Sequence, residues 1–199
     1  LFINRGETIF IVGGNGSGKS TFINILTGLY QPSEGNILLN NLQIDSNKTK
    51  IQDLIAAVFT DSYIYSNNYD SYSLVDNKKY QELLEKMELN EIVLDQKESS
   101  ARRIFSKGQT KRMSLILALL EEKPILVLDE WAADQDPYFR KYFYETLLPK
   151  LKEEGKTIIA VTHDDMYFKH ADRIIKFDSG KIVKDTEVTD KNHSDFLWH

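Results

Sequence analysis

Cysteine is absent from the 199 residues, which excludes disulfide bonds and metal centres that depend on cysteine ligands. Long apolar runs are lacking too, since the best candidate, MSLILALL at 113–120, is less than half as long as a membrane-spanning helix requires. No signal peptide is visible, and no methionine precedes the strand-like run after Leu1, so we expect the natural chain to begin upstream. Basic residues are outnumbered, with 25 Lys and Arg against 30 Asp and Glu, and the net charge of −5 argues against a dedicated nucleic-acid-binding protein.

Apolar runs that read as strands alternate with helix-like segments along the chain. ETIFIV (7–12), PILVLDE (124–130) and TIIAV (157–161) are mostly apolar, which is typical of parallel strands covered by helices on both faces. GNILLNNLQI (35–44) reads as a hairpin that turns at Asn40-Asn41. We therefore predict an α/β fold with a mainly parallel sheet core, a small antiparallel β part and an inserted helical subdomain.

The length suits one domain with its own hydrophobic core. We expect a single domain over 1–199, with a core of about 1–60 and 123–199 and a helical insertion of about 61–122. The insertion contains a helix whose apolar residues share one face through spacings of three and four: Tyr80, Leu83, Leu84 and Met87.

Two further helices are predicted from their ends. One runs from about Lys19 to Leu29. The other begins with Asp136 as its N-cap and Pro137 in the first helical position, and it ends at Gly155. Its core-facing residues recur every four positions: Phe139, Phe143, Leu147 and Leu151.

A glycine-rich segment, GGNGSGKST at 13–21, separates the first predicted strand from the first helix. Gly-x-x-x-x-Gly-Lys-Ser from Gly13 to Ser20 matches the P-loop in full and in the right context. Glycines let backbone N–H groups surround phosphate oxygens, Lys19 can reach the β- and γ-phosphates, and the Ser20 hydroxyl can ligate Mg²⁺. The sequence thus predicts a P-loop NTPase fold and a nucleotide site formed by Gly13, Asn15, Gly16, Ser17, Gly18, Lys19, Ser20 and Thr21.

Two acids end the apolar strand ILVLDE at 125–130. Parallel strands present their carboxyl ends at one edge of the sheet, so these side chains are expected beside the P-loop. Asp129 would hold Mg²⁺ directly or through water, and Glu130 would polarise the attacking water. The alternative is an acidic strand end that caps the following turn.

The segment FSKGQ at 105–109 resembles LSGGQ, the signature of the ABC-transporter ATPase family, with Phe for Leu and Lys for the first Gly. A serine and a glycine backbone at a helix N-terminus can bind an anion. In that family the signature faces the γ-phosphate held by the P-loop of a partner subunit. The resemblance implies an ABC ATPase fold and nucleotide contacts from Ser106, Gly108 and Gln109. A serine-capped surface helix is the simpler alternative.

Two later motifs follow in the order of the same family. DQDP places Asp136 where the family has an aspartate that contacts across a dimer, and VTHDD places His163 where the family has a histidine near the γ-phosphate. The resemblance implies that Glu130, His163 and Lys19 are the catalytic residues. One position departs from the pattern, because Thr60 stands where the family carries a glutamine that contacts Mg²⁺. A metal contact from the shorter Thr60 would need a water or help from Asp61.

The combination of VFTD, SKGQ and DEWAADQDP is similar to the ATPase half of cyclic-peptide and siderophore exporters, of the pyoverdine or syringomycin type. This resemblance implies ATP and Mg²⁺ as cofactors, a second copy in a head-to-tail dimer and a transmembrane domain as partner. It implies a location at the cytoplasmic face of the inner or plasma membrane. Motion would reach the membrane helices through the insertion, with Tyr63-Ile64-Tyr65 as the contact or, equally, as local packing.

Two other classes of function remain open. A soluble ABC-type ATPase of DNA maintenance or translation would share these motifs, but the short insertion, the acidic charge and the absent cysteines argue against it. A small-molecule kinase would explain Lys19 and Ser20, but it would not explain the SKGQ and LDE segments.

Overall fold

A single sheet organises the part of the chain that the structure describes. This computed structural model describes residues 1–40, 42–43, 49–61, 77–90 and 105–189. Six strands in these ranges pair in the order β4-β5-β6-β1-β7-β8, parallel throughout except for the last pair. The mainly parallel core is therefore confirmed. The strands are β1 (Thr8–Val12), β4 (Ile55–Val58), β5 (Ile125–Asp129), β6 (Thr157–Val161), β7 (Arg173–Asp178) and β8 (Lys181–Glu187).

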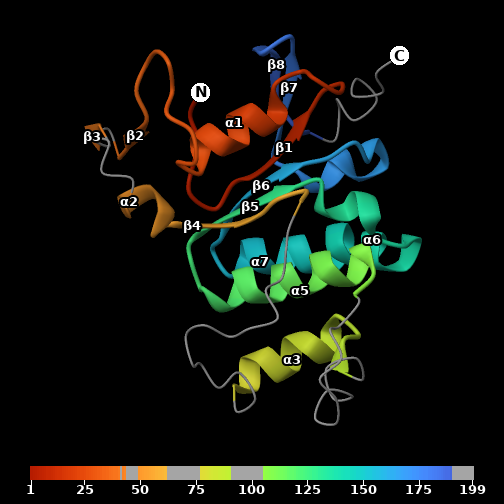
Figure 1. The fold of residues 1–199 in the computed structure, drawn as a ribbon. Helices are drawn as coiled ribbons and strands as arrows, with labels where there is room; N and C mark the ends of the chain where they lie inside the picture. The colour runs from red at the N-terminus through yellow and green to blue at the C-terminus, as the bar shows by residue number, and fades with distance from the viewer. Residues whose placement is uncertain (41, 44–48, 62–76, 91–104, 190–199) are drawn as a thin grey trace.

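Helices lie on both faces of this sheet (Figure 1). On one face lies α1 (Lys19–Leu26), and near it are the short α2 (Thr49–Gln52) and the antiparallel pair β2 (Leu38–Leu39) and β3 (Leu42–Gln43). The other face carries α5 (Lys107–Leu120) and a long helical segment that consists of α6 (Pro137–Tyr142), a π-helical turn η4 (Phe143–Leu147) and α7 (Leu148–Glu153). Two 3₁₀ turns, η3 (Trp131–Asp134) and η5 (Asp165–His170), follow β5 and β6.

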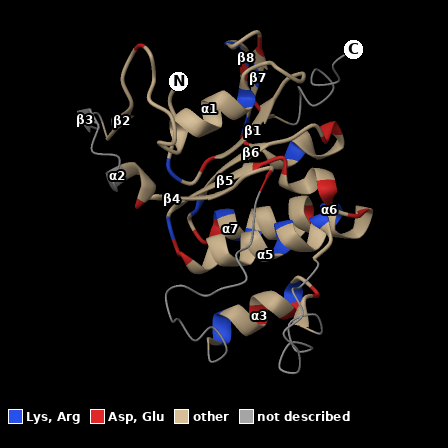
Figure 2. Cartoon of the chain, viewed as in Figure 1, with Lys and Arg blue, Asp and Glu red and all other residues tan. Residues whose placement is uncertain are grey.

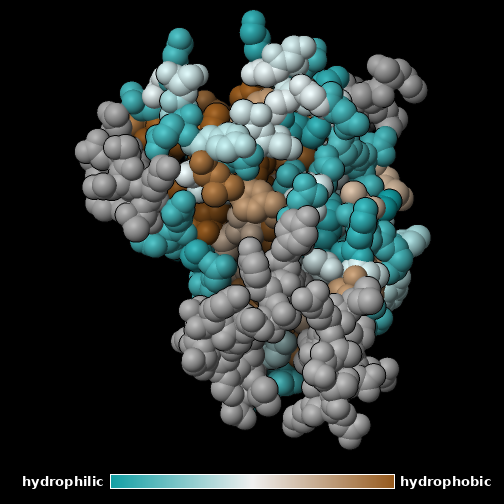
Figure 3. Space-filling view, in the orientation of Figure 1, coloured by the Kyte–Doolittle hydropathy of each residue, from teal (hydrophilic) through white to brown (hydrophobic). Residues whose placement is uncertain are grey.

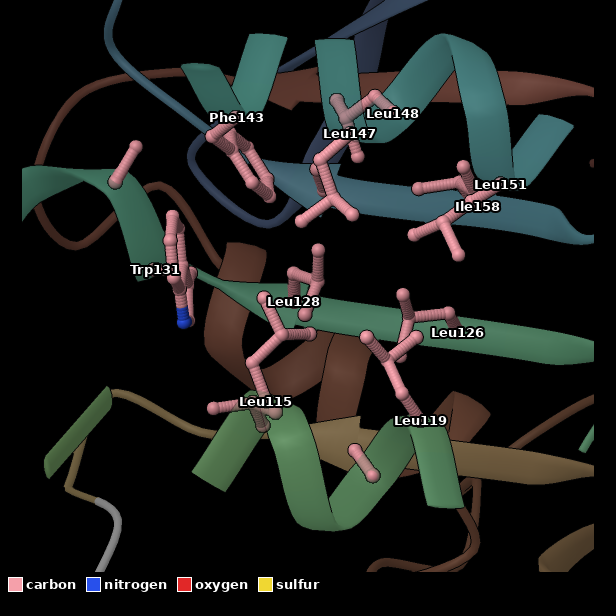
Figure 4. Packing of buried hydrophobic residues seen from close by; sticks show 14 of the residues in the cluster. Leu115, Leu119, Leu126, Leu128, Trp131, Phe143, Leu147, Leu148, Leu151 and Ile158 are labelled. Carbon is pink, nitrogen blue, oxygen red and sulfur yellow. The ribbon is translucent and has the colours of Figure 1, made fainter. Parts of the chain in front are cut away.

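The apolar strands divide their side chains between the two faces. Leu126 and Leu128 of β5 belong to the core under α5 and α7, whereas Val127 belongs to the core under α1. This alternation is the two-residue period of a strand, and it explains why a strand covered on both faces is apolar at every position. Figure 4 shows Leu126 and Leu128 between Leu119 of α5 and Leu147 of η4.

The core under α1 is open at its margin. Several of its outer members are only partly buried, and Figure 3 shows apolar surface gathered below α1 on this face of the molecule. They are Ile3, Phe22, Leu26, Ile37, Ala57, Phe59 and Ile125.

Charged residues of both signs occur together on single helices, for example on α3 (Lys78–Lys86) and α7 (Figure 2).

The helix after the glycine loop is shorter than predicted. It ends at Leu26 rather than Leu29, because Gly28 adopts a left-handed conformation with φ 74°. The Gly28 amide donates to Ile25 O and the Leu29 amide donates to Asn24 O, which is the Schellman pattern that terminates a helix.

The helix predicted from Asp136 to Gly155 begins and ends where expected. Asp136 is its N-cap, and Gly155 has φ 83° after the last turn. Its middle is not regular α-helix, since the Leu148 amide donates to Phe143 O across a π turn. Pro149 explains the widening, because a proline has no N–H for the carbonyl four residues back and its ring collides with that carbonyl.

The insertion is described only in part. The predicted helix is present as α3, and its apolar face, including Met87 just beyond its end, is buried against α5. The helix α5, which belongs to the predicted insertion, also packs against β4 of the core. These contacts do not separate the insertion from the core, so its boundaries at about 61 and 122 stay a prediction. Among the described residues no helix is both long and apolar enough to cross a membrane.

Candidate functional site

The glycine loop joins β1 to α1, as predicted, and it curves around the side chain of Lys19. Only 5% of Lys19 is exposed, and its Nζ donates to Gly13 O at 2.7 Å and Gly14 O at 3.0 Å. The buried Ser17 hydroxyl has no hydrogen-bond partner among the residues that the structure describes. Other predicted members of the site are exposed along the loop and the first turn of α1: Asn15, Gly16, Ser20 and Thr21.

Two of the glycines are required by the backbone itself. Gly13 has φ 147°, and a Cβ there would lie 2.3 Å from Phe177 O and 2.7 Å from Ser17 Oγ. Gly18 has φ 102°, and a Cβ there would lie 3.1 Å from Gly180 Cα. The loop thus needs glycine both for its left-handed conformation and for its close approach to the turn after β7.

Asp129 ends β5 with a buried carboxyl group. The residue is 5% exposed, and in the described part of the chain its Oδ1 atom has no hydrogen-bond partner. Burial raises the pKa of Asp129, and hydrogen bonding from Thr60 partly opposes that shift. The Thr60 hydroxyl also donates to Asp129 O at 3.3 Å, so the residue in the place of the usual glutamine does lie beside Asp129.

Glu130 and His163 meet at the carboxyl ends of neighbouring strands. Glu130 Oε1 lies 3.1 Å from His163 Nε2, because β5 and β6 pair in a register that sets Asp129 opposite Val161. Glu130 has a left-handed φ of 51°, and its side chain makes no hydrogen bond to the turn that follows. The alternative that Glu130 merely caps this turn is therefore not supported.

Ser106 begins α5 as the N-cap of a capping box. Its hydroxyl accepts a hydrogen bond from Gln109 N at 3.2 Å, and Gln109 Oε1 accepts one from Ser106 N at 2.9 Å. Ser106 is exposed, and the described hydrogen bonds of Ser106, Gly108 and Gln109 reach only α5 and Gln135, not the glycine loop. The signature segment is thus open to a second molecule, and the surface-helix alternative agrees with the same geometry.

Gly108 is packed tightly against the segment after β5. A Cβ at Gly108 would lie 2.8 Å from Asp134 O, and Gln135 Nε2 donates to Gly108 O at 3.2 Å. Asp136 follows directly, and its carboxylate accepts from Tyr138 N and Phe139 N at 2.9 and 3.0 Å. Within its own chain, Asp136 therefore caps a helix. Because its carboxylate is exposed, a further contact with a second copy of the chain stays a prediction.

Two residues that the sequence reasoning missed tie α5 to Glu130. Lys111 is 3% exposed; its Nζ donates to Glu130 O at 2.6 Å and lies 2.7 Å from Asp134 Oδ2. Trp131 Nε1 donates to Lys111 O at 2.8 Å, and the indole stacks on Phe143 at 4.5 Å. A signal was present, since Lys111 falls four residues before Leu115 on the buried face of its helix.

We expect a Trp131→Ala variant to lose about 3–5 kcal/mol of unfolding free energy, because it removes a buried indole and the hydrogen bond that the indole donates to Lys111 O. Urea unfolding followed by circular dichroism measures this change. A Tyr138→Ala variant removes an exposed aromatic side chain instead of a buried one and serves as the control. A loss for Trp131→Ala below about 1 kcal/mol would contradict this account of the indole.

The chain has relatives of known class. Residues 1–133 match the family model described as "ABC transporter". ATP-binding protein SyrD of Pseudomonas syringae pv. syringae is 44% identical over 94% of this chain and 34% of SyrD. A putative ABC transporter ATP-binding protein of Clostridium acetobutylicum, CA_C1368, is 34% identical over 92% of this chain and 70% of that protein. The chain therefore belongs to the ABC transporter family and is an ATP-binding ATPase domain of it.

Solved structures agree with this assignment. The ATP-binding cassette MJ0796, in a dimeric post-hydrolysis state bound to ADP and Pi, matches with a TM-score of 0.76 and 26% identity over 95% of this chain and 88% of its own. An ATP-bound bacterial Atm1-family ABC exporter matches in fold, with a TM-score of 0.80 and 21% identity over 98% of this chain and 36% of its own. The ABC ATPase fold is thus confirmed, while the chain spans only about a third of the length of SyrD.

Proposed function

We propose that this chain is the ATP-hydrolysing motor domain of an exporter of cyclic-peptide or siderophore type, in which two copies bind two ATP molecules head to tail. The observation that carries the proposal is the Glu130–His163 contact beside a loop folded around Lys19. The resemblance of VFTD, SKGQ and DEWAADQDP to exporter ATPases supports the exporter class, the likeness to ATP-binding protein SyrD supports ATP as the ligand, and the dimeric MJ0796 cassette supports the second copy.

The residues around Asp129 fit a magnesium ion. A cation would satisfy the buried Asp129 oxygen, which no described residue contacts with a hydrogen bond, and the hydroxyls of Ser20 and Thr60 are the further ligands that we propose. The described residues contain no cluster of three Asp, Glu or His side chains, so water and phosphate oxygens would complete such a site. When bound, Mg²⁺ supplies positive charge to the phosphate oxygens.

The proposed hydrolysis divides its tasks among three side chains. The Lys19 ammonium, now held by loop carbonyls, binds the β- and γ-phosphates, and the loop amides surround them. Glu130 accepts a hydrogen bond from the attacking water and polarises it. His163, held 3.1 Å from Glu130, orients that carboxylate and contacts the γ-phosphate.

The second copy would complete each site. Ser106, Gly108 and Gln109 are proposed to close over the γ-phosphate held by the glycine loop of the partner, and Asp136 to contact the partner beside it. Closure would pass to transmembrane helices at the cytoplasmic face of the membrane through the insertion. The Tyr63-Ile64-Tyr65 contact proposed for this step lies outside the described residues.

A mixing experiment tests the shared site. Lys19→Met and Ser106→Arg variants should each lose most ATP turnover, but an equimolar mixture should regain about a quarter of the wild-type rate. The reason is that half the dimers are mixed, and each mixed dimer has one site with both parts intact. ATP turnover of the mixture is compared with the sum of the separate rates.

The matched control for Ser106→Arg is Val183→Arg, which adds a charge on the exposed edge of β8 and should leave turnover unchanged. Mixed with Lys19→Met, it should give only the average of the two separate rates. If the mixture of Lys19→Met and Ser106→Arg also only averages the two separate rates, each nucleotide site lies within one chain and the head-to-tail dimer is wrong.

A further inference from the structure

Behind His163 lies a ring of three hydrogen bonds centred on a buried tyrosine. Tyr144 is fully buried, and its hydroxyl donates to Asp164 Oδ2 at 3.0 Å while lying 2.6 Å from Thr162 Oγ1. Asp164 N donates to Thr162 Oγ1 at 3.0 Å and closes the ring. The hydroxyl of Tyr144 therefore holds both residues that flank His163.

The donor and the acceptor of each hydrogen bond in this ring of three are fixed by the groups that form it. Burial raises the pKa of Tyr144 far above its ordinary value, so the phenol stays protonated and can donate to the Asp164 carboxylate. Because the single phenolic proton of Tyr144 is donated to Asp164, the Thr162 hydroxyl donates its own proton to the Tyr144 oxygen.

One helical turn earlier, Arg140 joins this ring to the segment after Glu130. Its NH1 group donates to Asp164 Oδ1 at 3.4 Å, and its NH2 group donates to Ala133 O at 3.4 Å and Gln135 O at 3.3 Å. A single guanidinium thus contacts the loop that carries His163 and the turn that begins at Glu130. Glu130 and His163 themselves lie 33 positions apart in the sequence.

The π turn holds the tyrosine ring in place. Tyr144 lies in η4, where it stacks on Tyr167 at 4.3 Å and meets the edge of Phe10 at 5.7 Å. Both partners are buried, so the ring has little freedom to move. Single π turns in α-helices often occur at functional sites.

We propose that Tyr144 and Arg140 are positioning residues for ATP hydrolysis. They hold the His163 loop and the Glu130 turn so that the two side chains stay in contact. The inference rests on the proposed roles of Glu130 and His163. A positioning role differs from a purely structural role in one respect. In a positioning role, Tyr144 affects turnover only through His163.

The test is Tyr144→Phe in two backgrounds. In the wild-type background we expect kcat to fall about tenfold, with ATP affinity within about twofold, because only the orientation of the catalytic pair changes. In a His163→Ala background the same substitution should cause no further fall, since the group that it positions is gone. Single-turnover assays with enzyme in excess keep the slow rates measurable.

Two further variants sharpen the result. Tyr138→Phe removes a hydroxyl from an exposed tyrosine on the same helical segment and should leave kcat unchanged. Arg140→Ala should behave as Tyr144→Phe does, and it carries the test if Tyr144→Phe does not fold. If kcat of Arg140→Lys lies between those of Arg140→Ala and the wild type, the positive charge beside Asp164 contributes to the positioning.

The outcomes separate the two proposals. Equal losses for Tyr144→Phe in both backgrounds, or no loss in either, would overturn the positioning role alone. Wild-type turnover in His163→Ala would contradict the proposed catalytic pair, and the positioning role with it. Faster amide hydrogen exchange confined to residues 162–164 in Tyr144→Phe is the structural change that we expect beside the kinetic one.

Discussion

Replacing Glu130 by glutamine is expected to stop ATP turnover while leaving ATP binding intact. The amide keeps the size of the side chain and an oxygen at the position that faces His163, but it cannot polarise water as a carboxylate does. We expect kcat to fall at least about 100-fold and the ATP dissociation constant to stay within about threefold. Phosphate release and titration calorimetry with ATP measure the two quantities.

The same variant should accumulate as a dimer in the presence of ATP, because the γ-phosphate that would join the copies persists. Size-exclusion chromatography with and without ATP detects it. Glu153→Gln, at an exposed acid of α7, is the matched control and should change neither property. Turnover of Glu130→Gln near the wild-type rate would remove Glu130 from the mechanism.

Replacing Lys19 by methionine should have the opposite signature, a loss of ATP binding itself. The ammonium inside the loop is the group that would exchange its bonds to Gly13 O and Gly14 O for phosphate oxygens. Loss of a charged hydrogen bond of about 1.5–3 kcal/mol should weaken ATP binding about 10- to 100-fold. Titration calorimetry measures this affinity, and turnover should fall with it.

Lys86→Met on the exposed face of α3 is the control for Lys19→Met, since it removes one lysine charge away from the loop. Thermal unfolding should show that both variants remain folded. Unchanged ATP affinity in folded Lys19→Met would mean that the loop binds phosphate without this ammonium, and the site would need another cation.

Much of the site could be predicted because its motifs are contiguous. The loop from Gly13 to Thr21 is set by local backbone conformation, and the required glycines at Gly13 and Gly18 show in the sequence as glycines. Asp129 and Glu130 were placed at a strand end by the apolar run before them. The Asp136 cap was predicted from a single side chain and the proline after it.

The contacts behind these motifs could not be predicted, since they join segments far apart in the sequence. No neighbouring residue explains Trp131, whose indole contacts Lys111 O and Phe143. Tyr144 sits beside the predicted stripe residue Phe143, yet nothing in the helical spacing indicates that its hydroxyl meets Thr162 and Asp164. The π turn that helps place it accompanies Pro149, and the spacing of apolar residues in this helix does not predict such a turn.

The class of fold, the nucleotide loop and the acids at the strand end could be predicted from the residues alone, because each depends on neighbouring residues whose geometry is local. The contact of Glu130 with His163, the bond from Thr60 to Asp129 and the arginine that joins two loops became known only from the folded chain. They depend on the order of strands in the sheet. Apolar periodicity shows that a strand is buried, but it does not show which strand lies beside it.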